Sequence, residues 1–319
     1  MLSLRATISV ADKPISLNQS PCLSTKTQTL SLLSLSQSIQ RRALVSATDG
    51  AKDFEVVNGR MASAGGLTRV EVDLLPSGLR QELMPRHVAV CADGCGRWAH
   101  KRGLPPSAGH AAGVRSLKEM IDLSGKWGIK VLTVFLFSTE NWFRPKAEVD
   151  FYMDLYERVV EHELMSACSG DGVRLSMIGD ASRLPKSFQE VWAKAEQSTK
   201  NNSGLHLILA MSYGGKYDIT QACKSIAHKV EDGLITLEDI DEKLVGQEIS
   251  TGRAEFPCVD LWMRTSGELR ISNFLLWELA YAELYFSPVL WPDFGKAEFV
   301  EALHSYQQRQ RRFGDRVSS

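Results

Sequence analysis

Two arginines near the end of the chain stand six residues apart, in a stretch rich in small hydroxyl side chains. Arg264 and Arg270 each carry a planar fork of N–H donors, which matches the oxygens of a phosphate group. Thr265, Ser266 and Ser272 lie between or beside them and can complete the set of donors. The pattern favours a diphosphate site, and its alternative interpretation is a surface turn in front of a core helix.

Acidic and backbone groups in the same stretch suit the same ligand. Glu268 and Glu283 offer the hard oxygen ligands that a divalent cation bridging phosphates requires. An apolar helix is predicted over 273–281, and the N–H groups of its first turn would face an anion. Together these features predict diphosphate chemistry supported by a metal ion.

A second candidate segment follows the first apolar run and reads Asp93-Gly94-Cys95-Gly96-Arg97-Trp98. Two glycines let backbone N–H groups come close to an anion, Arg97 adds positive charge, and Asp93 can hold a magnesium ion. The alternative is a tight turn between a strand and a helix. The segment is neither a Walker loop nor a dinucleotide fingerprint.

Further polar residues follow the next apolar run. Ser138 and Asn141 are neutral donors, for which helix capping is the alternative role, and Arg144 is another phosphate-ligand candidate. His110 follows Gly109 at the start of a predicted helix. A single histidine in such a place is more often structural than catalytic.

The segments that must position these side chains alternate between strands and helices. Apolar runs predict strands over 87–92, 130–137, 173–178, 205–211 and 259–263. Helical spacing predicts helices over 111–126, 145–163, 186–199, 217–231 and 297–312, besides the one from 273. This alternation predicts a single α/β domain with a central, mostly parallel sheet flanked by helices. Ligands of such sheets bind beyond the carboxyl ends of the strands, where Asp93, Ser138 and Arg264 fall.

The first 45 residues differ in composition from the rest of the chain. They contain nine Ser, four Thr, five Lys or Arg and a single acid, Asp12, which is typical of a plastid or mitochondrial transit peptide. We therefore expect a transit peptide over 1–45, a weakly structured lead-in over 46–80 and a catalytic domain over 81–319. A tail without structure is the alternative for the leader.

Charge and hydropathy exclude other classes of protein. Without the leader the chain has 32 basic and 37 acidic residues, a formal charge of −5. This balance argues against broad nucleic-acid binding, which needs a basic face. The sequence has no apolar run long enough to cross a bilayer, so no transmembrane segment is expected.

Six motifs follow one another in a specific order from about His87 to Gly314. They are HVAVCADGCGRWAHKRG, GHAAG, FSTENWFRP, GDASRLP, YGGKYDI and RTSGELRISNFLLWELAYAELYF. With these motifs the chain resembles the cis-prenyltransferases of the undecaprenyl diphosphate synthase family. The resemblance covers essentially all of the domain expected over 81–319. It implies the fold of that family and a Mg²⁺-dependent transfer between prenyl diphosphates.

The resemblance also implies roles for residues. Asp93 is expected to bind the metal and to be essential for catalysis, with help from Glu283 in binding Mg²⁺. The diphosphate of the allylic substrate is expected among Gly94, Cys95, Gly96, Arg97, Trp98 and His110, and that of the homoallylic substrate at Arg264, Arg270 and Ser272. His110, Ser138, Asn141 and Arg144 are expected to shape the reaction centre. The ending Arg312-Phe313-Gly314 resembles an Arg-x-Gly element that reaches the neighbouring subunit's site, which implies a homodimer.

Two departures from the family concern the allylic site. Cys95 stands where the family usually has Asn, in a hydrogen-bonded group with the counterparts of Ser138 and His110, and a thiol is a poor donor. Pro106 stands where the family usually has a phosphate-binding Arg. These departures predict altered reaction geometry, reduced activity or non-standard condensation.

A third departure concerns product length. Leu136 and Phe151 stand at positions of the product tunnel that are often small in the family. Leu155, Val160 and Ile178 are further candidates to line the tunnel, with core packing as the alternative. Bulk at Leu136 and Phe151 predicts that elongation stops early.

The sequence therefore predicts a cis-prenyl diphosphate synthase that joins five-carbon units into a product of ten to fifteen carbons in the plastid stroma. Three alternatives stay open. They are a head-to-middle, lavandulyl-type condensation of two dimethylallyl diphosphates, a synthase of longer polyprenyl chains, and a non-catalytic subunit of a heteromeric enzyme. Whether the acceptor is isopentenyl or dimethylallyl diphosphate also stays open.

Overall fold

The computed structural model describes residues 75–166 and 172–312, all of which belong to one unit, Arg69–Ser319. The expected transit peptide, most of the lead-in, and the Phe313-Gly314 end of the Arg-x-Gly element lie outside the described residues. Among the described helices, none combines the length and the apolar character that a bilayer-spanning segment needs.

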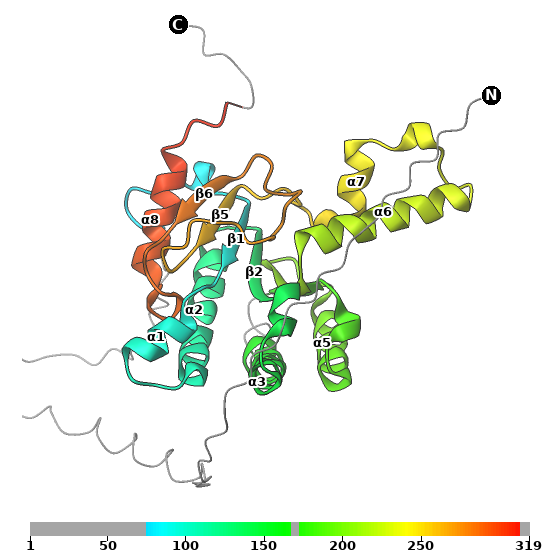
Figure 1. The fold of residues 1–319 in the computed structure, drawn as a ribbon. Coiled ribbons are helices and arrows are strands. Elements are labelled where there is room, and N and C mark those ends of the chain that lie inside the picture. Colours follow the sequence, from blue (N-terminus) through cyan, green and yellow to red (C-terminus); the bar gives the residue numbers. More distant parts are fainter. Residues whose placement is uncertain (1–74, 167–171, 313–319) are drawn as a thin grey trace, which may run out of the picture. The chain divides into compact units, whose positions relative to one another are not determined.

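Six strands form one sheet, and every neighbouring pair is parallel. The strands are β1 (His87–Cys91), β2 (Val131–Ser138), β3 (Arg174–Ile178), β4 (His206–Tyr213), β5 (Leu261–Arg264) and β6 (Glu283–Phe286). Their order across the sheet is β3-β4-β2-β1-β5-β6, and Figure 1 labels the β2-β1-β5-β6 part of it. The five predicted strands are confirmed to within two residues at each end. Strand β6 has no counterpart among the predictions, because a half-buried edge strand of four residues gives little periodic signal.

The helices that connect and cover the strands are α1 (Cys95–Lys101), α2 (Pro106–Lys126), α3 (Lys146–Arg158), α5 (Lys186–Thr199), α6 (Gly215–Glu231), α7 (Glu242–Glu248) and α8 (Lys296–Gln307). The helix predicted over 145–163 is α3 together with the π-helical turn η3 (Val159–Leu164). Helices α1 and α7 were not predicted, because seven residues are too few to show a periodic hydrophobic pattern. Helix α2 begins at Pro106, earlier than predicted, because proline suits the first helical position.

The helix predicted from residue 273 is wrong. The segment 271–282 forms turns, and Ser272, Asn273 and Leu275 have left-handed backbones with φ of 50°, 59° and 48°. Phe274 and Leu275 are fully buried against the sheet, so their apolar spacing reflects packing rather than a helix. The backbone N–H groups that we expected to face an anion from this helix are therefore not arranged as a helix start.

The loop 271–282 instead caps the start of helix α6. Asn273 accepts hydrogen bonds from the backbone N–H of Gly215 through its carbonyl (2.6 Å) and of Lys216 through its Oδ1 (2.9 Å), at the start of α6. Its Nδ2 donates to Glu140 Oε1 at 3.0 Å. These bonds connect the loop after β5 to the segment that follows β2. Two of the three segments in which polar residues were predicted to follow a strand are therefore in contact.

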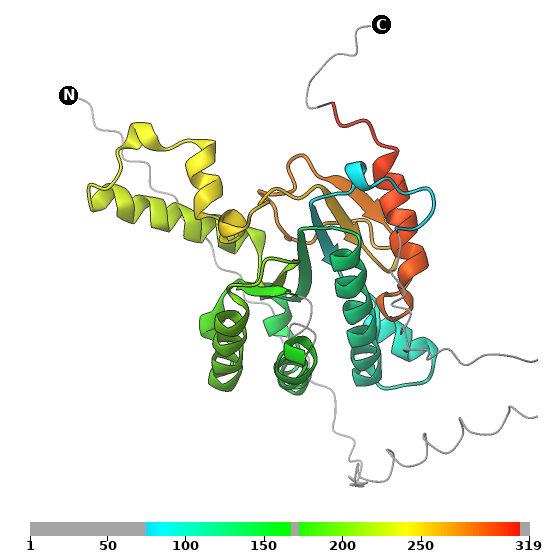
Figure 2. The ribbon, with the colours of Figure 1, turned by 180° about the vertical axis from the view of Figure 1, so that it is seen from behind.

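The sheet has an apolar core on each face. Helices α2, α3, α5 and α8 cover one face, where they bury side chains such as Met120, Phe188 and Phe299. Viewed from behind, α2, α3 and α5 stand side by side (Figure 2). The loop carrying Phe274 and Leu275 covers the other face. Both faces are thus dry, as a parallel sheet requires.

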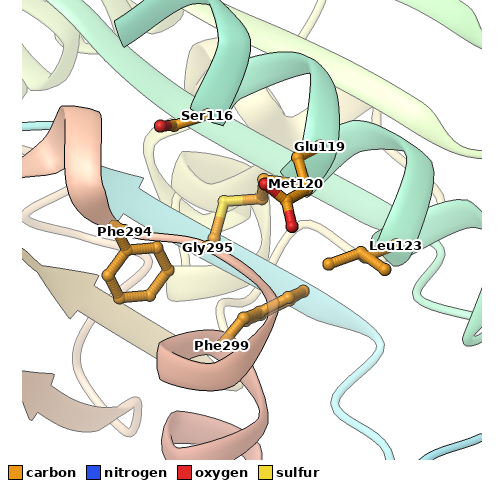
Figure 3. A pocket seen from close by; sticks show the side chains of 7 residues that line it. All are labelled: Ser116, Glu119, Met120, Leu123, Phe294, Gly295 and Phe299. Carbon is orange, nitrogen blue, oxygen red and sulfur yellow. The ribbon is translucent and has the colours of Figure 1, made fainter. Parts of the chain in front are cut away.

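Helices α2 and α8 meet around a small surface hollow that is too narrow to enclose a water molecule (Figure 3). Met120 and Leu123 of α2 face Phe299 of α8 across it. Glu119 Oε1 accepts from the backbone N–H of Lys296 at 3.1 Å, which places a carboxylate at the positive end of α8. This contact holds the start of α8 against α2.

Candidate active site

The turn after β1 brings Asp93 to the carboxyl edge of the sheet. Gly94 has φ of 109°, and a Cβ there would lie 2.9 Å from Leu290 Cδ2, so only glycine fits without strain. Cys95 then begins α1, which makes the segment the tight strand-to-helix turn that was the alternative interpretation. Around Gly96 a Cβ would meet nothing within 4 Å. Space beside α1 is therefore open to a ligand at this point.

Two guanidinium groups form ion pairs with the carboxylate of Asp93. Arg264 Nη2 lies 3.0 Å from Asp93 Oδ2, and Arg97 Nη2 lies 3.1 Å from Oδ1. Burial raises the pKa of Asp93, but the hydrogen bond from Arg264 and the charges of Arg97 and Arg264 outweigh it, so the pKa lies below its ordinary value. Asp93 is thus held as a carboxylate.

Arg264 also anchors the loop that follows β5. Its side chain is only 6% exposed, and Nη1 donates to the carbonyl of Arg270 and to Ser272 Oγ, both at 2.6 Å. Ser272, whose Oγ accepts one of these bonds, adopts a left-handed φ of 50°. Such backbone strain is held only where the surroundings determine it, and here the buried guanidinium does so.

Glu268 bridges the two more exposed arginines of the site. Its Oε1 accepts from Arg97 Nη1 at 2.8 Å, and its Oε2 pairs with Arg270 Nη1. The hydrogen bond from Arg270 is the main reason that the pKa of Glu268 is lowered. A diphosphate has the same preference for these donors, so it can replace Glu268 as their partner.

A second cluster surrounds His110 on α2. Its Nε2 lies 3.1 Å from Tyr152 Oη, which also lies 2.8 Å from Glu148 Oε1 and 3.0 Å from Arg144 Nη1. Burial and the charge of Arg144 lower the pKa of His110 to about 4. The sequence analysis named His110 and Arg144 but missed Glu148 and Tyr152. The spacing of four residues from Arg144 to Glu148 and on to Tyr152 was the available signal.

Helices α1 and α2 connect the two clusters. A Cβ on Gly109 would lie 2.0 Å from the carbonyl oxygen of Cys95, so the backbones touch at this glycine. Cys95 is buried, and burial is the first cause that raises the pKa of its thiol to about 12. In place of the Asn expected in a group with Ser138 and His110, the chain has a neutral, poorly donating thiol.

Ser138 and Asn141 use their polar groups on each other. Ser138 N donates to Asn141 Oδ1 at 2.9 Å, and the Ser138 side chain caps the 3-10 turn η2 (Thr139–Phe143) in return. This is the capping role that the sequence left as the alternative. It fixes Arg144, which follows directly, beside the His110 cluster.

A bulge in β2 determines on which face of the sheet Leu136, the expected chain-length residue, lies. Pairing with β4 shifts register between Phe135 and Phe137, so Leu136 and Phe137 both join the core beneath the helices. Leu136 and Phe151 are half-buried at the edge of this core. Ile178 packs into the core on the opposite face of the sheet, so its candidacy for the same tunnel is wrong.

Leu155 is half-buried beside the core beneath the helices, and Val160 is buried within it. Both therefore lie on the face of Leu136. For Val160, which is 1% exposed, core packing accounts for its position.

Other expected site residues lie apart from Asp93. Trp98 Nε1 donates to Asp293 Oδ1 at 2.7 Å, and its ring lies under Arg102. Arg312 Nη2 donates to Gln310 Oε1 at 2.6 Å, at the end of the described chain. Neither contact belongs to the two clusters above.

Glu283 lies at the opposite edge of the sheet from Asp93. It is level with Leu261 and, through it, with Val88, five residues before Asp93. At a rise of about 3.3 Å per residue, the three positions from Val88 to Cys91 alone separate the backbones of Glu283 and the Asp93 turn by about 10 Å along the strands. Glu283 pairs with Arg309 at 3.0 Å. One chain therefore does not bring Asp93 and Glu283 together.

The donor set near Asp93 suits a metal that arrives with phosphates. Mg²⁺ is commonly bound by one or two carboxylates, with phosphate oxygens and water completing six ligands. Asp93 and Glu268, which share Arg97, offer that number. Within 75–166 and 172–312 no three His, Cys, Asp or Glu side chains form a protein cage for a metal. The arrangement can bind diphosphate and polarise it beside an apolar layer.

Comparison with known proteins identifies this architecture. Residues 91–314 match the family described as "Putative undecaprenyl diphosphate synthase". The chain is 57% identical to dehydrodolichyl diphosphate synthase 2 of Arabidopsis thaliana, over 78% of this chain and 80% of that protein. It is 54% identical to the chloroplastic (2Z,6Z)-farnesyl diphosphate synthase CPT6 of Solanum lycopersicum, over 73% of this chain and 80% of that protein.

A solved structure agrees in fold as well as sequence. Lavandulyl diphosphate synthase from Lavandula x intermedia, in complex with dimethylallyl diphosphate, superposes with a TM-score of 0.72 at 42% identity, covering 73% of this chain and all of that chain. The resemblance inferred from the six motifs is thus confirmed: this chain belongs to the undecaprenyl diphosphate synthase family and is a prenyltransferase.

Proposed function

We propose that this protein is a Mg²⁺-dependent cis-prenyl diphosphate synthase that makes a short product of ten to fifteen carbons from five-carbon diphosphates. The observation that carries the proposal is the grip of Arg264 and Arg97 on the carboxylate of Asp93, next to the half-buried Leu136 face. Charged binding groups and an apolar layer are the two needs of a prenyl diphosphate.

The loop after β5 provides the site for the homoallylic diphosphate. Arg270 and Ser272 are held by Arg264, and Arg270 exchanges Glu268 for a phosphate oxygen when substrate binds. Each hydrogen bond to a charged group contributes about 1.5–3 kcal/mol, so several together hold a trianion.

The turn around Gly94 provides the site for the allylic diphosphate. Arg97, the open side of Gly96 and the His110 cluster surround it. Pro106, the first residue of α2, has no charged side chain and so gives no phosphate ligand here. Donors aimed at the leaving group stabilise the charge that develops as the allylic C–O bond breaks. The alkene of the second substrate then attacks the allylic cation, and the new cation loses a proton to the released diphosphate.

Asp93 would hold Mg²⁺, with Glu268 as the near second carboxylate. When bound, the ion neutralises diphosphate oxygens and so eases departure of the leaving group. Glu283 can serve the ion only from a second copy of the chain, because of its distance from Asp93. We therefore propose a homodimer in which Glu283, Arg312 and Gly314 complete the partner's site.

Mixing two inactive variants tests the shared site. Asp93→Asn and Glu283→Gln each disable a homodimer, but their heterodimer regains one site with both carboxylates. Subunit exchange is expected to restore about a quarter of the wild-type activity. Absence of any recovery, with dimers confirmed by sedimentation, contradicts the shared site.

A head-to-middle, lavandulyl-type condensation of two dimethylallyl diphosphates is the second candidate. It is favoured by the likeness to lavandulyl diphosphate synthase and by Cys95, which replaces the Asn donor expected in a group with Ser138 and His110. We also propose import into the plastid stroma by a transit peptide over 1–45. The chloroplastic names of relatives such as CPT6 support this destination.

Product analysis by mass spectrometry separates these functions. The full chain with Mg²⁺ receives each five-carbon diphosphate alone and then both. Linear C10–C15 products from the pair support the proposal, and a branched C10 product from dimethylallyl diphosphate alone supports the second candidate. Longer chains contradict the short product, and turnover only after adding a partner chain indicates an accessory subunit. Asp93→Asn should abolish turnover, while the exposed Asp154→Asn serves as its matched control.

A further inference from the structure

The hydroxyl of Tyr152 lies at the centre of the His110 cluster. It is within 3.1 Å of His110 Nε2, Arg144 Nη1 and Glu148 Oε1. The residue is 3% exposed, and its ring meets the imidazole edge-on with centroids 4.7 Å apart. Packing against the rings of Phe137 and Phe151 holds it there. The hydroxyl therefore has one fixed set of partners.

The number of protons in this cluster fixes the direction of each hydrogen bond. A phenol has one proton, a guanidinium only donates and a carboxylate only accepts. Tyr152 donates its proton to Glu148 and accepts one from Arg144. The phenol has no second proton for His110, so Nε2 of His110 must be the donor in their contact.

The state of the imidazole follows from this count. Because burial and the charge of Arg144 lower the pKa of His110 to about 4, the ring is neutral at pH 7 and carries a single N–H. That N–H is on Nε2, and the lone pair is on Nδ1. The hydrogen bond made by one ring nitrogen commonly sets the tautomer of a histidine in this way.

We infer that Tyr152 is a positioning residue, which holds His110 as the Nε2–H tautomer, so that Nδ1 carries a lone pair and Arg144, rather than His110, is the donor to the substrate diphosphate. The inference rests on the proposed function, in which His110 lies beside the allylic diphosphate. Tyr152 also orients Arg144, so one phenol aligns two groups of that site. Its role is exerted through them, without contact to the reacting atoms.

Nitrogen NMR of the intact protein with ¹⁵N-labelled histidine tests the tautomer. The chain has seven histidines, so the spectrum is simple and a His110→Gln sample assigns the signal. The wild type is expected to show a protonated Nε2 and an unprotonated Nδ1. Inorganic diphosphate with Mg²⁺ should shift the His110 signals and leave Nδ1 unprotonated. A protonated Nδ1, in the wild type alone or with diphosphate, overturns the inference.

Tyr152→Phe removes the hydroxyl and keeps the ring. It should shift the His110 nitrogen signals and raise KM for the allylic diphosphate about fivefold, as expected for one hydrogen bond, with a smaller effect on kcat. Tyr156→Phe is the control for the NMR signals, because Tyr156 donates to the carbonyl of Leu136 and does not contact His110. Unchanged signals and KM in Tyr152→Phe overturn the inference.

These measurements separate the inference from the proposed function. The tautomer and its response to inorganic diphosphate require no turnover, so they stand or fall without prenyl transfer. If Tyr152→Phe fails to fold, the wild-type spectrum and the diphosphate titration still decide. A protein with the expected tautomer but no prenyl product retains the positioning role and loses the proposed function.

Discussion

Replacement of Arg264 by lysine tests the central arrangement of the site. Arginine at this position makes three charge-assisted hydrogen bonds, to Asp93 Oδ2 and to the carbonyl of Arg270 and Ser272 Oγ. Lysine keeps the charge but has a single nitrogen, which cannot reach the same three acceptors. Arg264→Lys therefore separates the geometry of the guanidinium from its charge.

The loss in stability can be worked from these bonds. Two of the three are expected to be lost at about 1.5 kcal/mol each, or about 3 kcal/mol in total. Relaxation of the left-handed Ser272 returns about 1 kcal/mol of strain. A net loss of about 2 kcal/mol lowers Tm by about 4–8 °C in a domain of this size.

Activity should fall further than stability. Without its anchor the loop shifts Arg270 and Ser272, and a misplacement of about 1 Å costs on the order of 100-fold in rate. Thermal unfolding and steady-state kinetics at a temperature where both proteins are folded measure the two effects. Arg158→Lys, at an exposed position of α3, is the matched control. Wild-type Tm and kcat/KM in Arg264→Lys would refute the reasoning.

Three further predictions follow from single positions. Leu136→Ala should lengthen the products seen by mass spectrometry, whereas Leu234→Ala, 71% exposed, should not; equal lengths contradict the role of Leu136. Gly94→Ala should unfold at lower temperature because of its φ of 109° and the close Leu290, whereas Gly96→Ala should keep or raise Tm and lose diphosphate affinity by calorimetry; intact affinity removes Gly96 from the site. Because the folded pKa of Asp93 is lowered, its contribution to stability is present above its unfolded pKa of about 3.9 and is lost as pH falls through the lower folded value. Melting curves of Asp93→Asn should therefore fall less steeply than wild type below about pH 4, and parallel curves would contradict the pairing.

Much of the fold could be predicted because its signals are local. Four of the five predicted strands are short apolar runs in the middle of a sheet with both faces covered, and such runs are visible in one sequence; the fifth, β3, lies at an edge. The polar residues after them fall at one edge because parallel strands share their carboxyl ends. The convergence of Asp93, Arg97, Arg264 and Arg270 follows from that rule and the motif order.

The failures come from segments in which long-range contacts override local preference. The apolar spacing from residue 273 is that of a helix, yet Phe274 and Leu275 are buried as a turn because Asn273 is bonded to Gly215 and Glu140. Glu283 is in the family's motif, and only the strand register shows that it lies far from Asp93 in one chain.

The sequence by itself determined the chemical inventory, namely guanidinium, carboxylate and hydroxyl groups at the ends of predicted strands, and through its motifs the family. The tertiary structure alone decided how those groups pair. It showed Arg264 as a buried anchor, Glu268 as the bridge between Arg97 and Arg270, and Tyr152 as the partner of His110. The physical reason is that residue type and spacing act within a few residues, whereas hydrogen-bond partners here are up to 171 residues apart and are fixed by packing.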